Sequence, residues 1–167
     1  MRTLAYPLLA LILVGCQPSP QAGTTPARTA EEIRADFDSL RAEYQDLANA
    51  GNAAAVAGLY TADAVLVEPD GTVLKGREAI AQYFGNVLQG MSGLDIQTSE
   101  AFVHGDMVAG YGTFSQTLTG PEGPMNMSGM WQTVCVYGAD GSLKIRLHLD
   151  MIPAQLGPPT SSPGTTS

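Results

Sequence analysis

The chain has 167 residues, with eight lysine and arginine residues against sixteen aspartate and glutamate residues, and its formal net charge is −8. Such an acidic chain is unsuited to nucleic acid, whose phosphates would repel it, and to electrostatic docking on anionic lipid. Its two cysteines exclude a disulfide framework, and its two histidines lie outside the spacings typical of a metal cluster, so we expect no metal and no cofactor.

The first 15 residues have the layout of a secretory signal peptide. Arg2 provides the positive charge, and the apolar stretch from Leu4 to Val14 is well short of the ~20 residues that a membrane-spanning helix needs. Residues 13–16, Leu-Val-Gly-Cys, resemble the lipobox of bacterial lipoproteins, which implies cleavage before Cys16 and a lipid on its thiol. The alternative is an ordinary signal peptide with an accidental cysteine.

The residue after the cysteine bears on the location of the protein. Gln17 is not an aspartate, and by resemblance to lipoproteins of two-membrane bacteria this implies an anchor in the outer membrane, facing the periplasm. The inference requires a host with two membranes. Attachment would then depend on the lipid of Cys16 alone, because the acidic chain is unsuited to docking on anionic lipid. Several acyl chains on one residue anchor stably.

Two segments with few large apolar residues flank a single candidate domain. Residues 16–28 carry the lipidation site and are rich in Pro, Ser, Thr, Gln and Gly, so they are expected to form a flexible tether. Residues 154–167 have a similar composition and are expected to be a disordered tail. What remains, residues 29–153, has the length of one domain.

Three helices are predicted in the first part of this domain. Thr29 and Glu32 form a capping box, and apolar residues behind it recur at steps of four and three, which predicts a helix to about Asn49. Asn52 is expected to cap a second, shorter helix from Ala53 to Tyr60. The next predicted elements are a strand at 64–68, its return strand at 72–75 and a third helix at 77–88.

The second part of the domain is predicted to consist of four antiparallel strands. They cover residues 94–104, 107–118, 125–137 and 142–152. Gly110 and Gly112, inside the second of them, indicate a bulge or a sharp curve. Together the elements predict an α+β fold in which three N-terminal helices pack on a curved, mostly antiparallel six-stranded sheet.

Alternate residues of the last predicted strand divide between two faces of the sheet. One set is apolar and is expected to face the helices: Leu143, Ile145, Leu147, Leu149 and Met151. His148 and Asp150 belong to the other set, so we expect them on the outer, convex face. That face would meet water or a second copy of the chain.

Four short motifs occur in a recognisable order along the domain. They are Leu-Tyr-Thr-Ala-Asp-Ala at 59–64, Pro-Asp-Gly at 69–71, Gly-Arg-Glu-Ala-Ile at 76–80 and Asp-Gly-Ser-Leu-Lys-Ile at 140–145. In this order they resemble the NTF2-like superfamily, the cone-shaped α+β fold shared by SnoaL-like polyketide cyclases and ketosteroid isomerases. The resemblance covers essentially the whole domain, although Leu143 stands where a tryptophan is common. A shared fold leaves the activity open.

The ketosteroid isomerase pattern within this superfamily has three parts: a carboxylate base, a tyrosine donor and a protonated acid donor. The resemblance implies that Glu68, which precedes Pro69, is the base and that Tyr44 is the donor. Thr133 stands in the position of the acid. A threonine hydroxyl donates one hydrogen bond but does not replace a neutral carboxylic acid, and loss of one oxyanion donor typically costs ~10²–10³ in rate.

Three functions remain open at this point. The leading one is a lipid-anchored domain whose cone binds a small hydrophobic or amphipathic molecule, in a pocket lined by Phe37, Leu40, Leu66, Phe84, Trp131 and Cys135. The second is a cofactor-independent isomerase-like or cyclase-like proton-transfer enzyme that uses Glu68, Tyr44 and Thr133. The third is an envelope interaction module that forms a homodimer through the convex face of its sheet.

Overall fold

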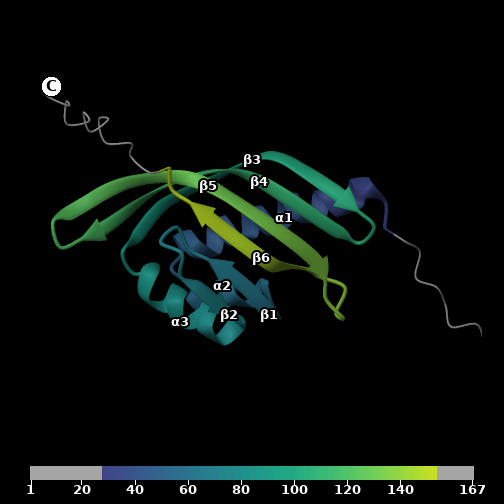
Figure 1. Cartoon of the computed structure of the whole chain (residues 1–167), viewed down its shortest axis with the longest axis horizontal. Helices are drawn as coiled ribbons and strands as arrows, with labels where there is room; N and C mark the ends of the chain where they lie inside the picture. The colour runs from purple at the N-terminus through teal and green to yellow at the C-terminus, as the bar shows by residue number, and fades with distance from the viewer. Residues whose placement is uncertain (1–27, 154–167) are drawn as a thin grey trace, which may run out of the picture.

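The computed structural model describes residues 28–153, so Cys16, the signal peptide, most of the tether and the C-terminal tail lie outside the described residues. Figure 1 shows the helices and strands of these residues. In chain order the elements are α1 (Ala30–Asn49), α2 (Ala53–Gly58), β1 (Tyr60–Val67), β2 (Val73–Lys75), α3 (Arg77–Val87), β3 (Met91–His104), β4 (Met107–Gly120), β5 (Gly123–Tyr137) and β6 (Leu143–Met151). Over residues 28–153, no helix is both long and apolar enough to cross a membrane.

The first two helices begin where their capping residues predict. The Glu32 backbone N–H donates to Thr29 Oγ1 at 3.2 Å, and the Thr29 backbone N–H donates to Glu32 Oε2 at 2.7 Å, which completes the capping box. Asn52 caps α2 by accepting from the backbone of Ala55. The second helix is shorter than predicted, because Tyr60 belongs to β1 instead.

Six strands form one sheet in the order β2-β1-β6-β5-β4-β3. The sheet is mixed, because β1 runs parallel to β6 while the other neighbours are antiparallel. Only α1 and α2 precede the first strand, and α3 follows β2, as in the predicted order of elements, so only the description of all three helices as N-terminal was inexact. In β3, a bulge opposite Gly112 accompanies the curvature predicted from Gly110 and Gly112.

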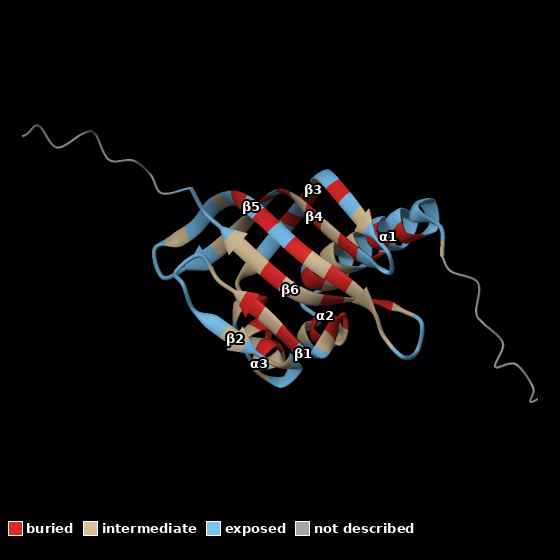
Figure 2. Ribbon diagram, turned by 45° about the vertical axis from the view of Figure 1, so that its right-hand side comes forward, coloured by how far each residue is buried: buried red, intermediate tan, exposed pale blue. Residues whose placement is uncertain are grey.

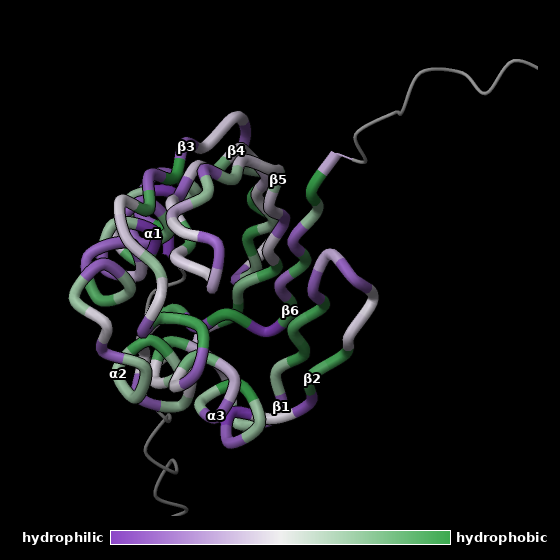
Figure 3. Tube along the Cα trace, turned by 90° about the vertical axis from the view of Figure 1, so that its left-hand side faces the viewer, coloured by the Kyte–Doolittle hydropathy of each residue, from purple (hydrophilic) through white to green (hydrophobic). Residues whose placement is uncertain are grey.

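A bulge in β6 overturns the predicted faces of that strand. Cys135 pairs with Ile145 and Val134 pairs with Leu147, so Arg146 is an extra residue between two register positions. Alternation of side chains is therefore inverted beyond it. Apolar and polar residues still alternate along β6 (Figure 3). Before the bulge the apolar residues face the helices, and beyond it the polar residues do.

His148 is consequently buried, with 6% of its surface exposed, and it faces the helices together with Asp150. The prediction that these two residues lie on the convex face was wrong. Beyond the bulge the outward set is apolar, and Met151 is 38% exposed. Phe102 and Met130 are also exposed large apolar residues of the sheet. Whether this face forms a homodimer contact stays a prediction.

Polar side chains of α1 bind the backbone of the edge strand β3. Arg34 donates to the Ala101 carbonyl at 3.0 Å and Arg41 to the Ile96 carbonyl at 2.9 Å, whereas Gln45 accepts from the Ile96 N–H at 2.7 Å. Asn49 bonds both the N–H and the carbonyl of Leu94, at 2.8 and 2.9 Å. The β3 edge of the sheet is therefore hydrogen-bonded to α1, the helix that covers it.

Candidate active site

A cavity of about 390 Å³ lies between α1, α3 and the inner face of the sheet. This volume is within the range of small-molecule sites. Five of the six residues expected to line the pocket do so: Phe37, Leu40, Phe84, Trp131 and Cys135. Leu66 does not line it but is fully buried in the core. Burial raises the pKa of the Cys135 thiol to about 12, which leaves that thiol unreactive at neutral pH.

Glu68 is positioned at the end of β1, where the chain leaves the sheet for the turn that follows. Its backbone N–H donates to the Thr72 carbonyl, which holds the residue in place. The carboxylate lines the cavity. Burial raises its pKa and the nearby Asp150 adds to the effect, while a hydrogen bond from Tyr83 and the His148 ring oppose it. A carboxylate with a raised pKa is a stronger base once ionised.

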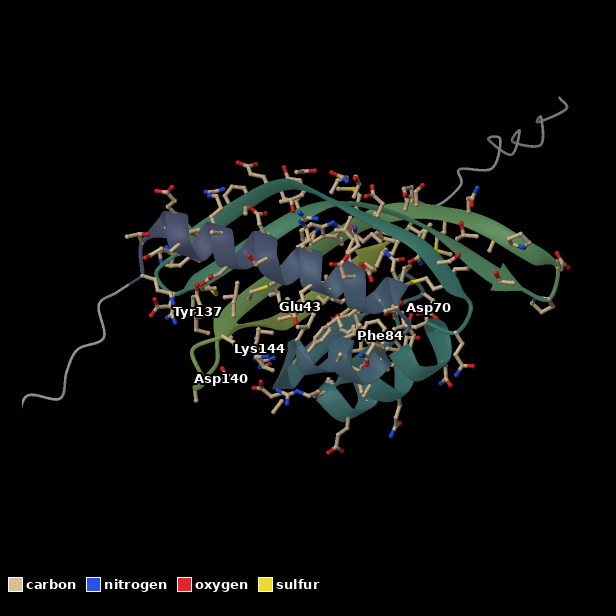
Figure 4. All side chains as sticks on the ribbon, turned by 180° about the vertical axis from the view of Figure 1, so that it is seen from behind. Glu43, Asp70, Phe84, Tyr137, Asp140 and Lys144 are labelled. Atoms are coloured by element: carbon tan, nitrogen blue, oxygen red, sulfur yellow. The ribbon has the colours of Figure 1, made fainter. Side chains whose placement is uncertain are left out.

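Tyr44 lies on the inward stripe of α1 and lines the same cavity. Its ring packs edge-on against Phe84, with 6.1 Å between ring centroids, and against His148 at 5.9 Å. Burial is the main reason that its pKa is raised, so the hydroxyl stays protonated and can donate. Figure 4 shows Phe84 and Asp70 at this end of the molecule, and Tyr137 at the other end of α1.

A further set of three polar side chains comes from β1 and β6. The Tyr60 hydroxyl lies 2.7 Å from His148 Nδ1, and His148 Nε2 lies 3.2 Å from Asp150 Oδ1. Burial by itself would lower the pKa of His148, but the charge and hydrogen bond of Asp150, with the charge of Glu68, raise it overall. The imidazole is therefore held between a tyrosine hydroxyl and a carboxylate.

Two residues that line the cavity carry a buried polar atom without a hydrogen-bond partner among the described residues. Thr133 is 8% exposed, and its Oγ1 lacks a partner; the Nε of Arg41 also lacks one. Both residues line the cavity. An unpaired buried polar atom is costly to the fold. Residues 28–153 contain no group of three or more His, Cys, Asp or Glu residues able to hold a metal ion.

Comparison with known proteins agrees with this architecture. A family model described as a SnoaL-like domain matches residues 40–143, more than half of the chain. The chain belongs to the SnoaL-like family. A steroid Delta-isomerase from Nocardioides simplex is 31% identical to this SnoaL-like chain over 112 residues, which are 66% of the chain and 86% of the relative.

Solved structures share the NTF2-like fold of the SnoaL-like domain. A ketosteroid isomerase-like protein from Erwinia carotovora atroseptica has a TM-score of 0.65 and 17% identity, and the match covers 78% of this chain and all of the other (100%). A putative aromatic ring hydroxylase from Novosphingobium aromaticivorans has a TM-score of 0.64 and 20% identity over 78% of this chain and 94% of its own. Identities this low show the fold alone.

Sequence reasoning identified three residues that the SnoaL-like domain brings to one cavity, namely Glu68, Tyr44 and Thr133. It missed the polar residues beside them, Tyr60, Tyr83, His148 and Asp150. Tyr60 was placed in a helix, and the two residues of β6 were placed on the wrong face. Alternation along the strand could not find the last two, because one extra residue inverts it.

Proposed function

We propose that the domain binds a small, mostly apolar carbonyl compound in its cone and transfers a proton on it. The observation that supports the proposal is that Glu68 and Tyr44 line one cavity, with a raised pKa at Glu68. A base and an oxyanion donor in one water-poor pocket are the minimum that proton abstraction beside a carbonyl needs.

In the proposed reaction, Glu68 takes a proton from the carbon beside the substrate carbonyl. The electrons of the broken C–H bond form a C=C bond, and the carbonyl oxygen becomes an oxyanion that accepts a hydrogen bond from Tyr44. Glu68 then returns the proton to a different carbon of the conjugated system. The net result is an isomerisation, which consumes no cofactor and leaves the enzyme unchanged.

The lining of the cavity restricts the substrate. Glu68, Asp70 and Asp150 contribute carboxylates, whereas Arg41 and His148 are the basic side chains among the lining residues. An anionic ligand would meet this negative surface, so we infer a neutral substrate. Most other lining residues are aliphatic, aromatic or methionine, which suits a hydrocarbon skeleton.

The test uses a Δ5-3-ketosteroid as the first substrate, because a related protein is a steroid Delta-isomerase. We expect conversion to the conjugated enone, followed by its ultraviolet absorbance. Glu68→Gln should lower the rate by ~10²–10⁴, and Tyr44→Phe by ~10²–10³. The matched control is Glu43→Gln, which removes an exposed carboxylate of α1 beside Tyr44 and should leave the rate unchanged.

Binding without turnover is the second candidate, favoured by the apolar walls of the cavity. It predicts that the steroid binds equally well to the unmodified chain and to Glu68→Gln, and that neither converts it. A rate that does not change in Glu68→Gln would overturn the assignment of Glu68 as base. Saturable binding with no conversion of any enolisable ketone would overturn the proposed proton transfer and support binding as the function.

We also propose that the domain is exported and held on the outer membrane by a lipid on Cys16. The proposal rests on the residues Leu-Val-Gly-Cys at 13–16 and on Gln17. Labelling of cells with a palmitate analogue should mark the protein, and Cys16→Ser should abolish both the label and the membrane fraction. A labelled Cys16→Ser protein would contradict the proposal.

A further inference from the structure

The strand β5 continues past the end of its neighbour β6 and leaves part of one edge unpaired. β6 ends at Met151, which pairs with Met130, whereas β5 pairs with β4 as far as Gly123. Figure 1 shows β4 and β5 running on together beyond the end of β6. Among residues 28–153, no strand therefore neighbours β5 on this side between residues 123 and 129. The unpaired backbone groups of such an edge are a template for another extended segment.

The inner side of this edge is apolar and borders the cavity. Met127 and Ile152 both line the cavity, and Ile152 is 38% exposed. Met125 lies two positions from Met127, so it belongs to the same face of the strand. With 59% of its surface exposed, it is the most exposed large apolar side chain among the described residues. Next to the unpaired edge, an apolar wall of the cavity is therefore open to water.

The outer side of the same edge is polar. Ser128 and Pro153 line a hollow of about 380 Å³, to which Asp95 of β3 also contributes. Asn126 lies two positions from Ser128 and accepts a hydrogen bond from Thr117 Oγ1 at 2.9 Å. A segment that fits this edge should therefore present apolar side chains on the inner side and a polar side chain on the outer side.

The chain supplies such a segment directly after its last described residue. The next four residues are Ala-Gln-Leu-Gly, and Leu156 is the last large apolar residue of the sequence. Continuing the register of β6 with β5 places residues 154–156 opposite residues 125–127, in antiparallel order. Leu156 then lies opposite Met125 on the inner side, and Gln155 lies on the outer side. The alternation of the segment thus matches that of the edge.

Prolines limit the length of this contact. Pro158 and Pro124 follow directly on the two strands in the extended register, and neither has an N–H to donate. Pro153 is compatible with the extension, because proline is tolerated in a strand that forms the edge of a sheet. A contact of so few residues is weak by itself, so its occupancy would respond to whatever fills the cavity beside it.

Building on the proposed function, we propose that residues 154–156 dock on the unpaired edge of β5 as a continuation of β6 and close this side of the cavity. Leu156 would cover Met125 and exclude water from the wall formed by Met127 and Ile152. Because the segment is joined to β6, it meets the edge at a high effective concentration. A bound apolar ligand and the docked segment would stabilise each other, since both bury the same wall.

The first test determines the register by disulfide cross-linking of the full chain in detergent. Met125→Cys combined with Leu156→Cys should form a disulfide within one chain, because facing positions lie within the ~7 Å that such a bond spans. The matched control combines Met125→Cys with Gln155→Cys, whose side chains would lie on opposite faces, and should cross-link several-fold more slowly. Equal rates would overturn the proposal. A disulfide between two chains would also overturn it and assign the edge to a second copy.

The second test compares amide hydrogen exchange in the full chain and in a chain that ends at Pro153. The amides of residues 125–129 that point away from β4 should exchange about tenfold more slowly in the full chain, as expected for a segment docked ~90% of the time. Leu156→Asp should remove this difference, because it places a carboxylate against the apolar wall. Ser161→Asp, the same charge beyond the contact, should retain it. Equal exchange in the two chains would overturn the docking.

The third test connects the segment to the cavity, with 4-androstene-3,17-dione, a conjugated steroid enone, as the probe. Its dissociation should be about tenfold faster from the chain that ends at Pro153 and from Leu156→Asp than from the full chain, whereas Ser161→Asp should not change it. Equal dissociation rates would overturn the closure of the cavity. If the steroid does not bind while the first two tests succeed, a steroid as the substrate of the proposed function is overturned and the docked segment stands.

Discussion

The half of the domain around the start of α1 is closely packed, whereas the other half encloses the cavity, which α1 borders from Phe37 to Tyr44. Where the two halves meet, Phe37 lies so close to Gly110 that a Cβ at that position would overlap its ring. The end of β5 is also tied to α1, because Tyr137 donates to Asp36 at 2.6 Å and Arg28 stacks on the Tyr137 ring. Buried and exposed residues alternate regularly along the strands there (Figure 2).

The other half shows the opposite features. Glu68 is held where burial raises its pKa, and the Thr133 hydroxyl lacks a partner among residues 28–153. Each of these features costs stability and is useful only when a ligand is present. The comparison shows that one half of the cone supplies the stability that allows the other half to carry an unfavourable site.

The comparison predicts unequal losses for equal truncations in the two halves. Ile33, which is 1% exposed in the packed half, should lose ~2–5 kcal/mol of unfolding free energy on substitution by alanine. Leu88→Ala, at 5% exposure beside the cavity, should lose less, because its side chain already borders empty space. Urea denaturation of both variants measures the difference, and equal losses would break the comparison.

Glu68→Gln should stabilise the protein at neutral pH. A raised pKa in the folded state means that the protonated group stabilises the fold, and that this contribution is lost as pH rises through the folded pKa. The variant should therefore match the unmodified chain below about pH 4.5. At pH 7 it should exceed it, toward the lower end of ~0.5–2 kcal/mol because part of the carboxylate reaches solvent. Urea midpoints at the two pH values test this, and a variant less stable at pH 7 would contradict it.

The smallest expected difference in stability is between variants that each lose one hydroxyl group. Tyr137→Phe removes a made hydrogen bond in the packed half and should cost ~0.5–1.5 kcal/mol. Thr133→Val removes a hydroxyl without a partner and should cost nothing or stabilise slightly. Thermal unfolding measures both; a loss for Thr133→Val equal to that of Tyr137→Phe would mean that the hydroxyl of Thr133 is satisfied in the free protein.

Most of the fold could be predicted from the sequence because its signals are local. The capping box at Thr29, the apolar stripe of α1 and the turn glycines each act within a few residues of the chain. The elements and their order follow from such patterns. The parallel pairing of β1 with β6 could not be predicted in this way, because it joins residues more than eighty positions apart.

The site was predicted only where it lies outside the bulged strand. Glu68 and Tyr44 were found through motifs of the family, and their backbones follow regular patterns. His148 was misplaced because alternation assigns faces by counting, and one extra residue, Arg146, reverses the count. That bulge is held by contacts across the sheet, since Arg146 donates to the Asp63 carbonyl at 2.7 Å and forms an ion pair with its side chain at 3.1 Å.

The bonds that α1 makes to β3 have a consequence for the life of the protein outside its native state. The side chains that cover the β3 edge of the sheet and the tyrosine donor Tyr44 therefore lie on the same helix. A partial unfolding that detaches α1 would therefore remove Tyr44 from the site and, in the same event, expose the edge of β3, which could then pair with a strand of another chain. Inactivation and aggregation should begin from the same intermediate, so that a ligand that holds Tyr44 in place would also delay aggregation.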